Sequence, residues 1–229
     1  MEIDTLPHVC LKNNKLKKAI EESKALFFDL DGTLIDTEPL YFYFWKKAME
    51  SFGAHPKDED VLKMRSLDVT LAKEHLKSID PDLDYDIVKA RRIALMSDYL
   101  STHEIRVKDG VFEMLHKYFG SKDMYIVTAN TVEKAQKILD ETKLDPFFKG
   151  IISAKDVERG KPFPYVYEYA SKYIGLKPEE IVVFEDSPNG IKSAKEAGNV
   201  VVYVLDMTYP TDEDKKFYDY LLVEWKEII

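Results

Sequence analysis

The sequence FFDLDGTL, residues 27–34, ends an apolar run that is typical of a short buried β-strand. Asp29 and Asp31 follow this strand directly, and Gly32 allows the chain to turn sharply. Open α/β sheets bind their ligands at the C-terminal tips of parallel strands, so we expect both carboxylates to lie at a ligand site. Their mutual repulsion requires a cation, a shared proton or hydrogen bonds. A simple Asp-rich turn is the alternative, and Asp31-Gly32 alone would favour it.

Three further strings carry polar side chains at the end of a predicted strand or before a predicted helix. YIVTAN, residues 125–130, contains Thr128 and Asn130. GKP, residues 160–162, places Lys161 directly before a helix start. IVVFEDSP, residues 181–188, places Glu185 and Asp186 after a third apolar run. The four strings, in this order, indicate a functional site far more strongly than any one of them does alone.

With these motifs the sequence resembles the haloacid dehalogenase (HAD) superfamily, and most of all its branch of phosphatases and β-phosphoglucomutase-like enzymes. The resemblance runs from about residue 25 to about residue 205. It implies an α/β fold, a Rossmann-like doubly wound parallel sheet, with a helical cap domain inserted just after the first motif. A branch that breaks carbon–halogen bonds lacks the second aspartate, so Asp31 favours phosphate chemistry.

Phosphoryl transfer from a monoester requires a nucleophile, a proton for the leaving oxygen and neutralisation of the phosphate charge. A carboxylate can attack phosphorus and form an aspartyl-phosphate, which divides one difficult step into two. We assign Asp29 as the nucleophile and Asp31 as the general acid that afterwards activates water. Leu30 between them puts both carboxylates on the same side of an extended chain. The resemblance implies the same two roles.

A divalent cation, which we expect to be Mg²⁺, would offset the acidic cluster and bridge it to the phosphate. Asp29 and Asp186 are the expected ligands. The resemblance adds the backbone carbonyl of Asp31, and it adds Glu185 either as a ligand or as a neighbour of the ligands. Helix capping is the structural alternative for Glu185 and Asp186, because Ser187 and the following proline look like a helix start.

Three other side chains are predicted to contact the phosphate. Thr128 offers a hydroxyl hydrogen bond, and Lys161 offers a positive charge to phosphate and carboxylate. Asn130 either donates a further hydrogen bond or caps the helix that follows. A purely structural role is the ordinary alternative for Thr128, and solvent exposure is the ordinary alternative for Lys161. Their places in the motifs favour the contact with phosphate for both.

Composition limits the function classes. The net charge of −9 provides no basic excess for nonspecific binding to nucleic acid or anionic membranes. Cys10 is the only cysteine, so no intramolecular disulfide can form, and no base is evident to make it a nucleophile. Charges interrupt every apolar run, so we expect no signal peptide or membrane span. These features predict a cytoplasmic protein. From the motifs and the resemblance we expect a small phosphorylated metabolite as its partner, and we expect the chain to be a monomer or weak dimer.

The spacing of apolar residues predicts the domain organisation. Residues 1–37 and 107–229 form the core, and residues 38–106 form an inserted domain of three helices. Within the core, residues 1–24 are an N-terminal extension. Leu16, Ala19 and Ile20 predict a helix lying on the core, with a flexible appendage as the alternative. Strands and helices alternate from residue 110 to residue 205, and the tail from Thr211 is expected to be helical and peripheral.

The cap is expected to select the substrate, with Glu38, Lys63 and Arg65 as candidate contacts. A solvated loop is the alternative for Lys63 and Arg65, and we interpret His75 and His103 as structural. Lys63 lies where the mutases carry a cap lysine. Leu67 appears in place of their cap arginine, and Tyr41 or a neighbour replaces their histidine, so we favour a phosphatase over a sugar phosphomutase. A catalytically silent binding protein is less favoured, because Asp29, Asp31, Lys161 and Asp186 are all retained.

Overall fold

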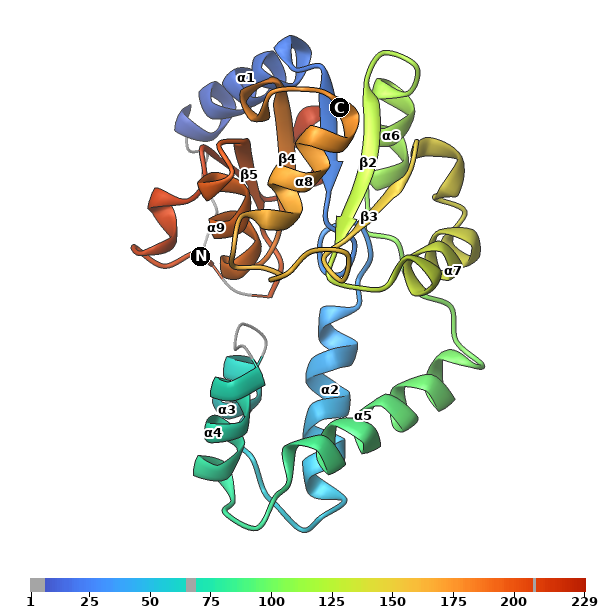
Figure 1. Ribbon diagram of the computed structural model, residues 1–229, viewed down its shortest axis with the longest axis vertical. Helices are drawn as coiled ribbons and strands as arrows, with labels where there is room; N and C mark the ends of the chain where they lie inside the picture. The colour runs from blue at the N-terminus through green and yellow to red at the C-terminus, as the bar shows by residue number, and fades with distance from the viewer. Residues whose placement is uncertain (1–6, 65–68, 208) are drawn as a thin grey trace. The chain divides into compact units, whose positions relative to one another are not determined.

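The structure is a computed structural model that describes residues 7–64, 69–207 and 209–229 (Figure 1). The chain divides into two compact units, which we describe separately. Unit 1 comprises Met1–Ile35 and Arg106–Ile229, and unit 2 comprises Asp36–Ile105. In the described part of the chain, no helix is both long and apolar enough to cross a membrane.

Unit 1 is built on a six-stranded parallel sheet in the order β3-β2-β1-β4-β5-β6. The strands are β1 (Ala25–Phe28), β2 (Asp123–Thr128), β3 (Ile151–Ser153), β4 (Ile181–Glu185), β5 (Val200–Val204) and β6 (Tyr220–Leu222). From β1 the chain moves outward to β3 and then returns to β4 on the other side of β1. Phe28, the last residue of β1, pairs with both Ile126 and Phe184, so the C-terminal ends of the three central strands lie within two residues of one another. This reversal of direction is where doubly wound sheets bind ligands.

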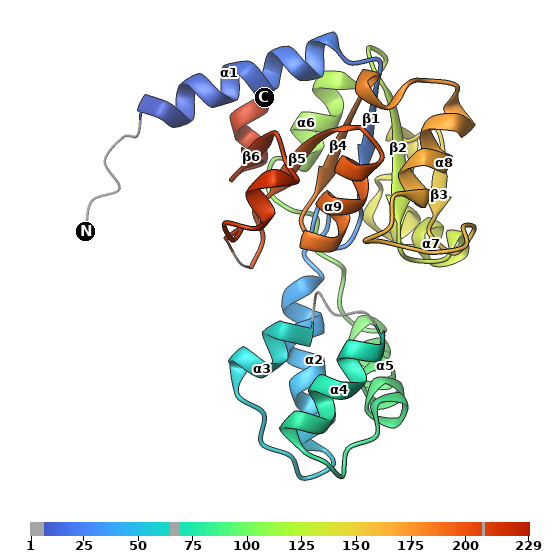
Figure 2. The same cartoon turned by 60° about the vertical axis from the view of Figure 1, so that its left-hand side comes forward.

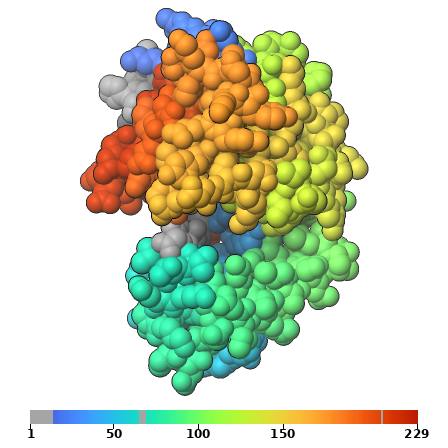
Figure 3. Space-filling view, viewed as in Figure 1, coloured from blue at the N-terminus to red at the C-terminus, as the bar shows by residue number. Residues whose placement is uncertain are grey.

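Helices cover both faces of the sheet, which confirms the predicted doubly wound α/β fold (Figures 1 and 2). On one face, α8 (Tyr165–Ile174) and α9 (Pro188–Glu196) bury apolar side chains against the strands. The surface formed by α8 is seen in orange in Figure 3. On the other face lie α6 (Val111–Tyr118) and the short helix η5 (Trp225–Ile228), which contact each other. α7 (Val132–Thr142) packs against β3.

The predicted N-terminal helix is confirmed, whereas the prediction of a helical and peripheral C-terminal tail is wrong. α1 (Pro7–Glu22) buries Leu16 and Ile20 and packs against β6 and η5. The tail contains the strand β6 between two short 3-10 helices, η4 (Asp214–Lys216) and η5. A three-residue strand is too short to show an alternating pattern, so its partner β5 determines its conformation. Leu222 and Trp225 are buried, so the tail belongs to the core.

Unit 2 is helical and consists, in its described part, of α2 (Glu38–Glu50), α3 (Asp58–Lys63), α4 (Val69–Ile79) and α5 (Tyr85–Leu100). α2, α4 and α5 follow the predicted spacing, whereas the single turn-and-a-half of α3 was not predicted. Met49, Leu76 and Val88 lie in a small apolar core of their own. Asp84 caps α5 by accepting hydrogen bonds from the backbone N–H groups of Asp86 and Ile87.

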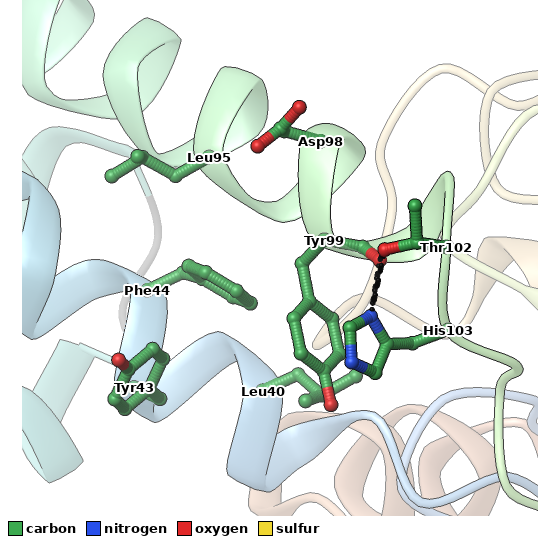
Figure 4. A pocket seen from close by; sticks show the side chains of 8 residues that line it. All are labelled: Leu40, Tyr43, Phe44, Leu95, Asp98, Tyr99, Thr102 and His103. Atoms are coloured by element: carbon green, nitrogen blue, oxygen red, sulfur yellow. Dashed lines mark hydrogen bonds between the residues drawn. The ribbon is translucent and has the colours of Figure 1, made fainter.

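α2 and α5 leave a pocket of about 500 Å³ between them (Figure 4). It is lined by Leu40, Tyr43, Phe44, Leu95, Asp98, Tyr99, Thr102 and His103. His103 stacks on Tyr99 with ring centroids 3.9 Å apart, and its Nδ1 lies 2.9 Å from the Thr102 hydroxyl. His75 Nε2 lies 2.8 Å from the backbone carbonyl oxygen of Asp60. Both histidines thus contact other residues of unit 2, and their structural role stays a prediction.

Candidate active site

The first motif forms a tight loop directly after β1. The backbone N–H of Asp29 donates to the carbonyl of Phe184, which continues the β1–β4 ladder by one residue. The N–H groups of Leu34 and Ile35 both donate to the carbonyl of Leu30, and Gly32 adopts a φ of 79°. That left-handed conformation is readily available only to glycine. The loop leaves Asp29 buried and Asp31 half-buried at the end of the sheet.

Lys161 connects the first motif to the fourth. Its ammonium nitrogen lies 2.6 Å from Asp29 Oδ1, 2.5 Å from Glu185 Oε1 and 3.1 Å from the carbonyl oxygen of Val127. The three ammonium protons therefore each have an acceptor. Burial by itself would lower the pKa of Lys161, but Asp29 and Glu185 hold it well above its usual value. Lys161 is a fixed positive charge between two carboxylates.

The charge balance of the cluster is negative. Burial raises the pKa of Asp29 to about 8, and the charges of Glu185 and Asp31 add to this rise, while Lys161 opposes it. One ammonium group faces more than one carboxylate, so ionisation of Asp29 leaves an excess of negative charge in a poorly solvated place. The site is therefore suited to a further cation.

Glu185 is held on both of its carboxylate oxygens. Oε1 accepts from Lys161 and from the Tyr167 hydroxyl at 3.1 Å, and Oε2 accepts from the hydroxyl of Ser187 at 3.1 Å and from its backbone N–H at 3.3 Å. Ser187 is also the N-cap of α9, because its hydroxyl accepts from the N–H of Gly190. Capping is thus performed by Ser187, and Glu185 positions Lys161.

The carboxylates can hold a metal ion. Asp29, Glu185 and Asp186 each offer an oxygen, and these oxygens lie within 4.8 Å of one another. Hard oxygen ligands of this kind suit Mg²⁺. Both oxygens of Glu185 accept hydrogen bonds within the protein, and Asp29 and Asp186 are the ligands that the sequence predicts. The hydroxyl of Thr33 donates to Asp186 Oδ1 at 2.9 Å and orients it.

Asn130 contacts the second aspartate of the first motif. Its Nδ2 donates to Asp31 Oδ2 at 2.5 Å and lies 3.3 Å from the hydroxyl oxygen of Thr128. Lys134 Nζ donates to Asn130 Oδ1 at 2.7 Å, which fixes the orientation of the amide. The following helix, α7, is capped by Thr131. Helix capping thus falls to Thr131, and the Asn130 amide donates to Asp31; a hydrogen bond from Asn130 to the phosphate stays a prediction.

The structure brings seven predicted side chains together at the C-terminal ends of β1, β2 and β4: Asp29, Asp31, Thr128, Asn130, Lys161, Glu185 and Asp186. Glu38 begins α2, and Lys63 is exposed at the end of α3, so both belong to unit 2. Arg65 and Leu67 lie outside the described residues. In unit 2 the Arg92 guanidinium lies over the ring of Tyr41, 4.9 Å from its centroid.

Sequence reasoning missed Tyr167, Gly190 and the hydrogen bond of Thr33. Tyr167 belongs to α8 and is buried, so in the sequence it is indistinguishable from a core residue. A Cβ atom on Gly190 would lie 1.9 Å from Glu185 Cδ, so this glycine allows α9 to approach the carboxylate. Its position two residues after a proline in the fourth motif was the one available signal.

Comparisons with known proteins show the family to which the chain belongs. The chain is 28% identical over 196 residues to the phosphorylated carbohydrates phosphatase of Thermotoga maritima, covering 79% of this chain and 84% of that protein. It is 32% identical over 181 residues to the validoxylamine A 7'-phosphate phosphatase of Streptomyces hygroscopicus subsp. limoneus, covering 76% and 82%. The β-phosphoglucomutase structure from Clostridium difficile shares the fold, with a TM-score of 0.71 at 15% identity over 90% of this chain and 93% of that chain. Residues 26–204 match the model of the haloacid dehalogenase-like hydrolases, and the chain belongs to that family.

Proposed function

We propose that this chain is a Mg²⁺-dependent phosphatase that hydrolyses a small phosphorylated metabolite through an aspartyl-phosphate on Asp29. One observation carries the proposal: Asp29 is held at the tip of β1 by Lys161, beside a second carboxylate, Asp31, that is held by Asn130. Phosphate monoester hydrolysis requires a nucleophile and an acid, and in this chain each of the two carboxylates is held by a different side chain.

In the first step, an oxygen of Asp29 attacks phosphorus. The Asp29–phosphorus bond forms, the bond to the leaving oxygen breaks, and Asp31 gives its proton to that oxygen. In the second step Asp31 takes a proton from water, the water oxygen attacks phosphorus, and the bond to Asp29 breaks. Lys161 reduces the repulsion between the carboxylate and the incoming phosphate. Thr128 offers its hydroxyl to a phosphate oxygen.

Asp29 and Asp186 are the proposed Mg²⁺ ligands, together with the backbone carbonyl of Asp31. When bound, the ion neutralises charge that develops on the phosphate oxygens. The proposal is supported by the raised pKa of Asp29, because a carboxylate buried beside others is stabilised in its charged form by a cation. Glu185 keeps Lys161 in place.

The substrate is proposed to be a sugar phosphate or a similar metabolite. Support comes from the two relatives, whose names give phosphorylated carbohydrates and validoxylamine A 7'-phosphate as what they act on. Unit 2 is proposed to be the cap that selects the substrate, with Glu38, Lys63 and Arg65 as candidate contacts. A helical unit inserted between β1 and α6 supports this role.

The test is phosphate release from a panel of sugar and polyol phosphates, with Mg²⁺ and with EDTA. We expect metal-dependent release by the wild type and loss of release in Asp29→Asn. Asp140→Asn makes the same change on the exposed surface of α7 and is expected to retain activity. Isomerisation of β-glucose 1-phosphate without phosphate release would instead establish the mutase. Release that Asp29→Asn leaves unchanged would contradict the proposal.

A further inference from the structure

Trp225, in the C-terminal tail, packs directly beneath the two strands that carry the carboxylates. It is only 2% exposed. Its ring lies against Phe28 and Phe184, with centroids 6.1 Å and 5.1 Å away, and these two phenylalanines stack on each other at 4.9 Å. Phe28 immediately precedes Asp29, and Phe184 immediately precedes Glu185. The indole therefore supports the last residue before each carboxylate pair.

The indole also makes a polar contact with the first motif. Trp225 Nε1–H donates to the backbone carbonyl oxygen of Thr33 at 3.3 Å. Thr33 is fully buried, and its hydroxyl donates to Asp186 Oδ1. Thr33 lies two residues after Asp31, in the loop that Gly32 turns. Hydrogen bonds thus join Trp225, through Thr33, to the proposed metal ligand Asp186, and the backbone of the loop joins Thr33 to the proposed acid Asp31.

The tail that carries Trp225 is itself anchored in unit 1. The backbone N–H of Leu205 donates to the carbonyl of Leu222, beside the β5–β6 pairing. Lys117 Nζ and the Tyr118 hydroxyl both donate to the carbonyl of Ile228, at 2.9 Å and 3.2 Å. Figure 2 shows β6 and the C-terminus beside α1 and α6. The indole is therefore held in place from α6 and from the sheet.

A glycine marks how closely the tail approaches unit 1. Gly110, just before α6, has a φ of +86°, and a Cβ atom there would lie 3.1 Å from Trp225 Cβ. Such a contact is tighter than side chains ordinarily allow. The glycine at the start of α6 thus allows the backbone of the tail at Trp225 to lie close to unit 1.

We propose that Trp225 is a positioning residue for the phosphatase reaction, which fixes the loop of Asp31 and Thr33 relative to Asp186. The inference rests on the proposed function. The family model matches residues 26–204, so Trp225 lies outside the matched part of the chain. The C-terminal tail then supports the active-site loop through contacts with Phe28, Phe184 and Thr33.

The first test is kinetic. Trp225→Phe keeps an aromatic ring against Phe28 and Phe184 and removes the N–H donor to Thr33. We expect kcat to fall about tenfold because the loop that carries Asp31 is then less well positioned, and KM to stay within about twofold because no substrate contact is lost. Ile228→Val removes one methylene from the same short helix and is expected to keep the wild-type kcat. Equal kcat values for Trp225→Phe and Ile228→Val would overturn the proposal.

The second test measures the fluorescence of Trp225 itself, a residue that stays unchanged in the variant used. Trp45 and Trp225 are the two tryptophans of the chain, so Trp45→Phe leaves Trp225 as the sole indole emitter. We expect its fluorescence to change saturably with Mg²⁺, and further with Mg²⁺ and orthovanadate. An emission that responds to neither would overturn the link. If the wild type hydrolyses no phosphomonoester, the proposed function fails, whereas this Mg²⁺ titration still tests the link between Trp225 and the carboxylates.

Discussion

Gly190→Ala should damage the site through Glu185 although it adds a single methyl group. A Cβ atom at residue 190 would lie 1.9 Å from Glu185 Cδ, 2.0 Å from Oε1 and 2.1 Å from Oε2. To reach an ordinary contact distance, the carboxylate must retreat by about 1.5 Å. Its hydrogen bonds of 2.5 Å to Lys161 and 3.1 Å to Tyr167 would then be broken or strongly bent.

Two effects of opposite sign decide the size of the change. Alanine is favoured over glycine inside a helix by up to ~1 kcal/mol. Each lost hydrogen bond to a charged group costs about 1.5–3 kcal/mol. We therefore expect the free energy of unfolding to fall by about 2–5 kcal/mol, which corresponds to a Tm lower by roughly 4–20 °C for a chain of this size. Because Lys161 loses one of its two carboxylate partners, kcat should fall as well.

The assay is thermal unfolding in EDTA together with phosphate release in Mg²⁺. Gly150→Ala is the matched control, since its Cβ would meet the Tyr125 ring at 3.8 Å, an ordinary contact. In a Glu185→Ala background the clash is absent, so Gly190→Ala should then cost little or even stabilise. A Gly190→Ala protein with wild-type Tm and activity would refute the reasoning.

Three further predictions concern the carboxylates and the tail. Because burial raises the pKa of Asp29 from 3.8 to about 8, the folded protein retains a proton there that the unfolded chain has lost. The metal-free protein should thus lose stability between about pH 4 and pH 8 relative to Asp29→Asn, as urea unfolding at several pH values will show; a difference that grows in favour of the wild type with rising pH would contradict this. Asn130→Ala removes the 2.5 Å hydrogen bond to Asp31 and should lower kcat about tenfold, with little change in KM, in the phosphate-release assay; an unchanged kcat would remove Asn130 from the site. Leu222→Ala should destabilise unit 1 by about 2–5 kcal/mol in chemical denaturation, whereas the exposed neighbour Val223→Ala should change stability by less than about 0.5 kcal/mol; similar effects of both would mean that β6 is not part of the core.

Most of the fold could be predicted because its elements carry their own periodicity. The helix from Tyr85 to Leu100 and the strand ending at Thr128 are long or apolar enough to be recognised locally. β6 could not be recognised, because three residues at a sheet edge show no period, and pairing with β5 supplies what the local sequence lacks. α3 was also not predicted, because a helix of only six residues is too short to show a clear apolar period.

The site shows the same division between local and long-range information. Asp29, Asp31, Lys161 and Asp186 were predicted because each lies in a short motif at a strand or helix end. The contact between Trp225 and Thr33 joins residues 192 positions apart, and no local pattern encodes it. The hydrogen bond from Tyr167 to Glu185 likewise depends on how α8 packs on the sheet.

The central claim, that Asp29 carries the phosphoryl group, can be tested by mass spectrometry of the protein during turnover. Asp31→Asn with p-nitrophenyl phosphate is the suitable combination, because this leaving group needs no proton in the first step while the second step still lacks its base. We predict that the rapidly quenched protein gains the mass of one phosphoryl group on the peptide containing Asp29. Release of p-nitrophenol without such a species, or a phosphoryl group on another residue, would contradict the account.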